Sequence, residues 1–230
     1  MKPEPTPDRS WTAPWALIAV LAVLFCALAI AASEIGTLPG DQAVTTFVQR
    51  ANGDAVRLAW HTGNALGTTA WVSALFVLIL VAVVALRWWR DACFLIVVML
   101  LRIVAMAFKG VIGSPRPTIA QANLQEVYHG TGFPSGHTLT STILLGGLAF
   151  VMVRHLRGRW VPVLACAIWI IGVLATGFAR VWSGAHWASD VLGAAMLGVL
   201  FVLIAANASA MLITLTARPN TTTSDTRAKA

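Results

Sequence analysis

The chain has 230 residues, of which 58% are hydrophobic and 11% charged, and its net charge is +7. Its apolar runs are long enough to cross a bilayer, which needs about 20 residues for a core of ~30 Å, and this excludes a water-soluble domain. A basic chain could bind nucleic acid, but these basic residues lie in short segments between apolar runs. The composition therefore predicts one all-α integral membrane unit with no nucleic-acid partner.

Six apolar runs predict a bundle of six transmembrane helices. The runs cover residues 13–32, 68–86, 92–108, 138–153, 161–178 and 187–215. We expect one membrane domain over residues 13–215 between two disordered cytoplasmic tails, residues 1–12 and 216–230. The first run resembles a signal peptide, because Lys2 and Arg9 precede it and Ala29-Ile-Ala31 resembles a cleavage site. It is longer than the usual core of about 7–15 residues, so we expect a retained helix.

The segment between the first two runs is mixed in character. Ala43, Val44, Phe47 and Val48 recur at helical spacing and predict a short amphipathic helix at the membrane surface. His61 falls in the same segment, and we expect it to be a surface residue without a role.

Lysine and arginine are distributed unevenly between the two sides of this layout. With the N-terminus inside, ten of them lie in inner segments and five in outer segments. The five outer cations are Arg50, Arg57, Lys109, Arg116 and Arg180. The bias fits the positive-inside rule and predicts a cytoplasmic N-terminus.

The three cysteines, Cys26, Cys93 and Cys166, all lie inside apolar runs. Because their number is odd and none is in a loop, we expect no structural disulfide. The sequence has no Cys/His cluster with metal-ligand spacing, no P-loop and no internal repeat, and we expect no metal or other cofactor.

Three polar stretches, residues 109–117, 132–138 and 178–190, interrupt the apolar pattern on the predicted outer side. In a bundle of alternating helices they meet at one end. The third stretch places His186 and Asp190 at i and i+4, so they face the same way on a helix. A carboxylate there accepts the ring N–H and leaves the other nitrogen free as base or nucleophile. Arg180 adds a cation in the preceding loop. The alternative is a polar connector in which Asp190 only caps the next helix.

The other two stretches suit a phosphate group. Ser135 precedes an apolar run and is a natural N-cap, so the amides of Ser135, Gly136 and His137 would form an anion site at a helix N-terminus. Arg116 and Arg180 offer planar forks that match phosphate oxygens, and Lys109 adds a compact charge. The alternatives are interfacial snorkelling of Lys109 and Arg116 and a helix cap without chemistry. Three such stretches at one face favour the phosphate site.

The three stretches together resemble the type-2 phosphatidic acid phosphatase superfamily. The resemblance rests on Lys109-x6-Arg116-Pro117, on Pro134-Ser135-Gly136-His137 and on Arg180-x5-His186-x3-Asp190. It implies a six-helix membrane phosphatase of the bacterial plasma membrane, with its site facing the periplasm or exterior. The group includes lipid phosphate phosphatases and undecaprenyl diphosphatases and, more distantly, vanadium haloperoxidases.

The resemblance also implies a mechanism. Lys109, Arg116, Ser135, Gly136 and Arg180 would bind the phosphate. His186 would attack phosphorus to give a phosphohistidine, Asp190 would orient His186, and His137 would protonate the leaving oxygen and later activate water. Asp190 is the only acid in the three motifs, which agrees with chemistry that needs no metal.

One position departs from the family pattern, because Ala179 precedes Arg180 where the family usually has serine. A hydroxyl that would bond the phosphate is therefore missing, and Thr176 and Ser183 are the nearest replacements in the sequence. Arg102 lies two turns before Lys109 on the same helix face, and we interpret it as a structural pair with a polar group of the bundle. His129, in the loop before Pro134, is a residue that substrate could touch.

The expected substrate is a lipid phosphate, because a site at the membrane–water boundary suits an amphiphile whose head group lies there. Undecaprenyl diphosphate is the first candidate, and phosphatidylglycerol phosphate, phosphatidate and lipid A phosphate are alternatives. A transporter or scramblase that grips phosphate head groups without cleaving them is a rival from another class. The His186–Asp190 pair with His137 favours the enzyme, because binding alone needs cations and no nucleophile.

Overall fold

The computed structural model describes residues 12–216, and within them it contains helices and no strands. The helices are α1 (Trp15–Ile35), α2 (Asp41–Gln49), α3 (Asp54–Ala65), α4 (Thr69–Ala85), α5 (Trp89–Ile112), α6 (Gly136–His155), α7 (Val161–Trp182) and α8 (Ala188–Thr216). The all-α fold is thus confirmed. The predicted tails lie almost entirely outside the described residues.

Among the described helices, α1, α5, α6, α7 and α8 are each long and apolar enough to cross a membrane. The predicted second span corresponds to α4, whose 17 residues extend only about 25 Å. It reaches spanning length together with α3, from which it is bent by 56° at a short break. The count is therefore five spans, or six when the bent pair is taken as one.

The short amphipathic helix predicted around residues 43–48 is present as α2. The sequence missed the second helix of this region, α3, which packs along α7. Close approach requires glycine here, because a Cβ at Gly63 would lie 2.2 Å from the carbonyl oxygen of Ala175 and one at Gly67 would lie 2.5 Å from the Cβ of His137. Gly63 thus lets α3 pack on α7, and Gly67 lets the break pack on the start of α6. His61 itself is exposed, as expected.

Helix α6 is the central element of the bundle. Two thirds of its apolar window is buried, whereas the corresponding share is 11–22% for α1, α5 and α7. It packs against α5, α7 and α8, and small residues permit this: a Cβ at Gly172 of α7 or Gly198 of α8 would collide with Leu145 or Thr142 of α6. Apolar side chains on the outer helices face the bilayer, where their exposure costs nothing.

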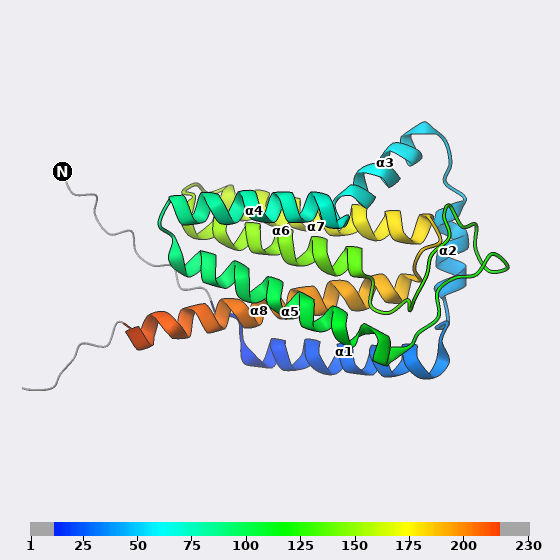
Figure 1. The fold of residues 1–230 in the computed structure, drawn as a ribbon, viewed down its shortest axis with the longest axis horizontal. Coiled ribbons are helices and arrows are strands. Elements are labelled where there is room, and N and C mark those ends of the chain that lie inside the picture. The colour runs from blue at the N-terminus through cyan, green and yellow to red at the C-terminus, as the bar shows by residue number, and fades with distance from the viewer. Residues whose placement is uncertain (1–11, 217–230) are drawn as a thin grey trace, which may run out of the picture.

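The two ends of the bundle, which Figure 1 shows at its left and right, carry different polar residues. At one end lie the start of α1 and the turns that join α4 to α5 and α6 to α7. There the buried carboxylate of Asp91 accepts hydrogen bonds from Arg154 Nη1 at 2.9 Å and His155 Nε2 at 2.7 Å, which fasten the start of α5 to the end of α6. His155 therefore has a structural partner at the end away from the three polar stretches.

At the opposite end, α2 lies across the bundle beside the 113–135 segment, the end of α7 and the start of α8 (Figure 1). The three polar stretches all reach this end, as the alternation of helices predicts. Within α5, Arg102 Nε donates to Thr140 Oγ1 of α6, which in turn donates to the carbonyl of Gly136 at 2.7 Å. This is the structural pairing expected for Arg102.

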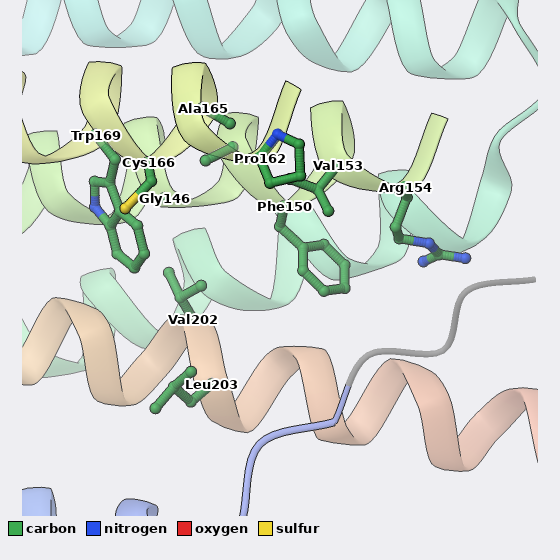
Figure 2. Close-up of a pocket in the computed structure, with 11 residues that line it drawn as sticks. Gly146, Phe150, Val153, Arg154, Pro162, Ala165, Cys166, Trp169, Val202 and Leu203 are labelled. Atoms are coloured by element: carbon green, nitrogen blue, oxygen red, sulfur yellow. The ribbon is translucent and has the colours of Figure 1, made fainter. Parts of the chain in front are cut away.

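A cavity of about 530 Å³ lies among α6, α7 and α8, away from the polar stretches (Figure 2). Its lining is almost wholly apolar, with Phe150, Trp169 and Leu203 contributing large side chains and Arg154 at one edge. It contains none of the residues expected to bind phosphate. Apolar walls on a membrane bundle match lipid chains, so we place the chemistry at the other end.

The orientation of the bundle can be tested with single cysteines. We expect Ala120→Cys, in the 113–135 segment, to react with an impermeant maleimide in intact cells, after permeabilisation of any outer membrane. Leu156→Cys, in the turn at the other end, should react only after lysis. Cys26, Cys93 and Cys166 are first replaced by alanine so that background labelling is removed. The reverse labelling pattern would contradict a cytoplasmic N-terminus.

Candidate active site

His186 lies at the centre of the polar end and is 2% exposed. It precedes α8 rather than standing within it, so the expected i, i+4 geometry inside one helix is wrong in detail. The contact nevertheless forms, because the first turn of α8 brings the Asp190 carboxylate back: Nδ1 of His186 lies 3.1 Å from Oδ2 of Asp190. The same oxygen accepts the backbone N–H of Trp187 at 3.1 Å. Asp190 therefore both caps the turn and orients the imidazole.

The remaining nitrogen of His186 faces Arg116, whose Nη1 lies 3.1 Å from Nε2. Arginine is only a donor, so Nε2 must be the acceptor and Nδ1 must carry the proton that goes to Asp190. The guanidinium is held by two carbonyls, with Nη1 donating to Ala185 at 2.6 Å and Nε donating to Gly130 at 3.2 Å. The structure thus gives His186 the tautomer that a nucleophilic Nε2 requires.

The electrostatic surroundings of His186 are strongly positive. Burial lowers the pKa of His186 well below its usual range, and nearby positive groups lower this pKa further. These groups are Arg116, Lys109, Arg180 and His137. Burial and the neighbouring charges therefore both favour the neutral imidazole. All the predicted charged and histidine residues are brought together around one ring.

Arg180 lies in the last turn of α7, not in the loop that the sequence predicts. It is buried, and its Nη1 donates to Oδ1 of Asn64 on α3. Its Cζ lies 5.3 Å from the ring centroid of Tyr128, a cation–π contact. Neither Asn64 nor Tyr128 was predicted from the sequence. Both are far from Arg180 along the chain, Asn64 by 116 residues, and no local pattern indicates such contacts.

Ser135 is the N-cap of α6, as predicted, but its side chain makes no capping hydrogen bond. The expected role of its backbone amide is wrong: that N–H donates to the backbone carbonyl of Asp190 at 3.1 Å and does not face an open anion site. The Ser135 hydroxyl instead accepts a hydrogen bond from Thr138 Oγ1 at 3.1 Å. The amides of Gly136 and His137 remain the expected phosphate donors at this helix end.

The start of α8 is held by a residue that the sequence did not single out. Asp41, buried at the start of α2, accepts the N–H of Ser189 at 2.9 Å and its hydroxyl at 2.7 Å. Gly132 supports the same turn, because its backbone lies so close that a Cβ there would be 2.8 Å from Oδ2 of Asp190. These contacts fix the turn that carries Asp190.

Residues 91–214, which carry the three polar stretches, match the PAP2 superfamily, and this range covers more than half of the chain. The chain belongs to the PAP2 superfamily. The family predicted from the three motifs is therefore confirmed.

Three curated relatives match over about a third of the chain. They are the bacitracin transport permease protein BcrC of Bacillus licheniformis, 36% identical over 72 residues, lipid A 1-phosphatase of Rhizobium johnstonii, 36% over 74 residues, and phosphatidylglycerophosphatase B of Bacillus subtilis, 31% over 77 residues. These matches span 30%, 26% and 36% of the relatives' own lengths.

Two crystal structures share the fold. A transmembrane PAP2-type phosphatidylglycerolphosphate phosphatase from Bacillus subtilis superposes with a TM-score of 0.70 at 21% identity, covering 88% of this chain and 98% of its own. Aquifex aeolicus LpxE gives a TM-score of 0.59 at 19% identity, covering 73% and 95%. This PAP2 protein therefore has the fold of multi-pass membrane proteins over nearly the whole described chain.

The contact between Asp41 and Ser189 predicts that α2 controls the site of this PAP2 protein. We expect Asp41→Asn to lower the unfolding midpoint and to weaken orthovanadate binding, because asparagine keeps one acceptor oxygen, whereas the carboxylate uses both oxygens for the N–H and the hydroxyl of Ser189. Hydrogen bonds to a charged group are worth about 1.5–3 kcal/mol. Ser189→Ala keeps the backbone bond and should lose less. A folded Asp41→Asn protein with unchanged vanadate affinity would restrict Asp41 to a role in stability.

Proposed function

We propose that this protein is a membrane lipid phosphate phosphatase that acts through a phosphohistidine. The observation that carries the proposal is the His186 imidazole: its Nδ1 is bonded to Asp190, its Nε2 is an acceptor, and cations surround it. A site that only binds phosphate needs the cations. An oriented, neutral nucleophile is useful only if a bond to phosphorus is formed.

In the proposed reaction the phosphate draws Arg116 away from Nε2, and this frees the lone pair for attack on phosphorus. Lys109, Arg116 and Arg180 spread the charge of the transferring group. Asp190 stabilises the imidazole as it becomes positive.

His137, at the second position of α6, gives a proton to the leaving oxygen. It then takes one from the water that cleaves the phosphohistidine. The product is free phosphate and a lipid with one phosphate fewer, and His186 returns to its neutral form.

For the substrate, we propose undecaprenyl diphosphate first, with phosphatidylglycerol phosphate, phosphatidate or a lipid A phosphate as the other members of the class. The matched relatives support this range, since two are named as phosphatases of phosphatidylglycerol phosphate and lipid A. We further propose that residues 13–215 form the membrane domain, that the site faces the periplasm or exterior of a bacterial plasma membrane, and that no metal is needed.

A transporter or scramblase remains the rival function, and one matched relative is named a transport permease. The hydrogen bond from His186 to Asp190 favours hydrolysis over transport. The two functions differ in one measurable quantity, the release of inorganic phosphate.

The proposal is tested by phosphate release from the four lipid phosphates in detergent micelles. We expect the wild-type protein to release phosphate, with or without EDTA, and His186→Ala to release none while still binding the lipid, because the cations remain. Binding without release by the wild type would favour the transporter. Activity in His186→Ala, or activity lost in EDTA and restored by magnesium, would contradict the metal-free covalent mechanism.

His137 separates monophosphate from diphosphate substrates. A monophosphate expels an alkoxide that needs a proton, whereas a diphosphate expels a phosphate whose second pKa is about 6. General acid help is worth roughly 10²–10⁴-fold where it is needed. We therefore expect His137→Ala to slow phosphatidate hydrolysis far more than undecaprenyl diphosphate hydrolysis, measured as the rate of the chemical step by rapid quench. Equal losses would leave His137 as a phosphate ligand only.

A further inference from the structure

Among the buried hydrogen-bond donors that have no acceptor within the described residues, two lie against each other at the site. They are Nε of Arg180 and the hydroxyl of Tyr128. Burying such a donor without a partner costs about 1–3 kcal/mol. The two residues are in contact, since the guanidinium of Arg180 lies over the Tyr128 ring. The tyrosine oxygen could accept the Nε–H, but the structure shows no such bond, and the hydroxyl proton would still lack an acceptor. One incoming acceptor beside both groups can take a hydrogen bond from each.

Tyr128 also lies close to the second arginine of the site. Burial lowers the pKa of Arg116, and Asp190 and Tyr128 act on this pKa in the opposite direction. Tyr128 therefore lies within electrostatic range of Arg116 and in ring contact with Arg180. This is the region in which the proposed phosphate group would be held.

The segment that carries Tyr128 is fastened above the site. Asn123 exchanges hydrogen bonds with the side chain of Gln49 on α2, at 2.9 Å and 2.7 Å, and Gln49 also donates to the carbonyl of Trp182 at 2.9 Å. Gln125 donates its N–H to the carbonyl of Ser183 at 3.0 Å. Tyr128 follows three residues later, so its placement beside Arg180 is supported by contacts to α2 and to the end of α7.

Other hydroxyls near Arg180 are already committed. Thr176 Oγ1 donates to the carbonyl of Gly172 at 2.9 Å, and Ser183 Oγ donates to the carbonyl of Arg180 at 3.4 Å. Both bonds lie within their own helix or its cap. Thr176 and Ser183 are the nearest residues that could replace the serine absent at position 179. Both therefore donate their hydroxyl protons to nearby backbone carbonyls.

Ser114 has a buried hydroxyl without a partner too. It lies on the Asp190 side, because its carbonyl accepts the N–H of Gly132 at 2.7 Å and Gly132 packs against the Asp190 carboxylate. Oδ1 of Asp190 is itself a buried acceptor without a partner. An unpaired donor and an unpaired acceptor therefore both lie on the Asp190 side of the site, whereas the unpaired Nε–H and hydroxyl of Arg180 and Tyr128 lie together elsewhere in it.

We infer that the Tyr128 hydroxyl donates a hydrogen bond to an oxygen of the bound phosphate group, next to Nε of Arg180. This inference rests on the proposed function for the identity of the substrate, but not for the presence of the anion. The tyrosine thereby supplies the neutral donor that Ala179 cannot. A tyrosine hydroxyl is a neutral donor, so it adds a hydrogen bond without adding negative charge to the phosphate site.

The test is orthovanadate binding to the full-length protein in detergent micelles, by calorimetry, with inorganic phosphate as a second probe. We expect Tyr128→Phe, which keeps the ring over Arg180, to bind vanadate roughly 10- to 100-fold more weakly. Thr176→Val is the matched control, since it removes a buried hydroxyl one turn before Arg180 and should bind as the wild type does. Unchanged affinity in Tyr128→Phe, or a loss in Ser114→Ala in its place, would overturn the inference.

A second readout does not depend on any substitution. Tyr128 is the only tyrosine in the chain, so protein labelled with 3-fluorotyrosine gives a single ¹⁹F resonance. This resonance should shift with vanadate and saturate at the calorimetric affinity. This readout remains if Tyr128→Phe fails to fold. A resonance of the labelled wild-type protein that does not shift with vanadate overturns the inference, and a saturating shift supports it.

The two proposals fail in different ways. If the wild type hydrolyses no lipid phosphate but binds vanadate with the expected Tyr128 dependence, the phosphatase proposal is wrong and the Tyr128 inference holds. If the wild type hydrolyses lipid phosphates and Tyr128→Phe is unimpaired in vanadate binding, the reverse is true. A wild-type protein that binds neither vanadate nor phosphate contradicts the inference directly.

Discussion

The site depends on one carboxylate oxygen, Oδ2 of Asp190, which accepts hydrogen bonds from both the imidazole and the backbone at the entrance to α8. Because one oxygen holds both donors, the ring orientation of His186 is linked to the position of the helix end. The protein fixes that helix end from three sides, through Asp41 of α2, the amide of Ser135 and the backbone of Gly132. The orientation of the His186 imidazole is thereby supported by contacts from three separate segments.

The positive charges around His186 do not stabilise the fold by themselves, and they match the anionic phosphate group that we propose as the ligand. Several cations gathered near one buried neutral ring repel one another, and burial raises the cost. Part of this electrostatic cost is offset by neutral acceptors of the arginine N–H groups. They are the carbonyls of Ala185 and Gly130 and the side chain of Asn64. None of these acceptors carries a full negative charge. In the proposed complex an anionic phosphate group would complete this balance of charge, and its binding energy would be concentrated at His186.

Much of this could be predicted from the sequence, because it depends on local patterns. Apolar runs predict the helices, their alternation brings Lys109, Arg116, His137 and His186 to one end, and the spacing of His186 and Asp190 predicts their contact. The remainder depends on distant pairs. Asp41 meets Ser189 across 148 residues and Asn64 meets Arg180 across 116, and no local pattern specifies such partners. The Ser135 amide was assigned to an anion because helix N-termini usually leave it free, whereas here a tertiary contact takes it.

Several supports of the site come from outside the segment that matches the family model. The family match begins at residue 91, yet Asp41, Gln49 and Asn64 lie upstream of it and hold the start of α8, the 113–135 segment and Arg180. Residues 91–214 therefore do not contain all the contacts that align the site. A chimera that exchanged only residues 91–214 with another protein of the superfamily would carry His137, His186 and Asp190 but leave behind these contacts from α2 and α3.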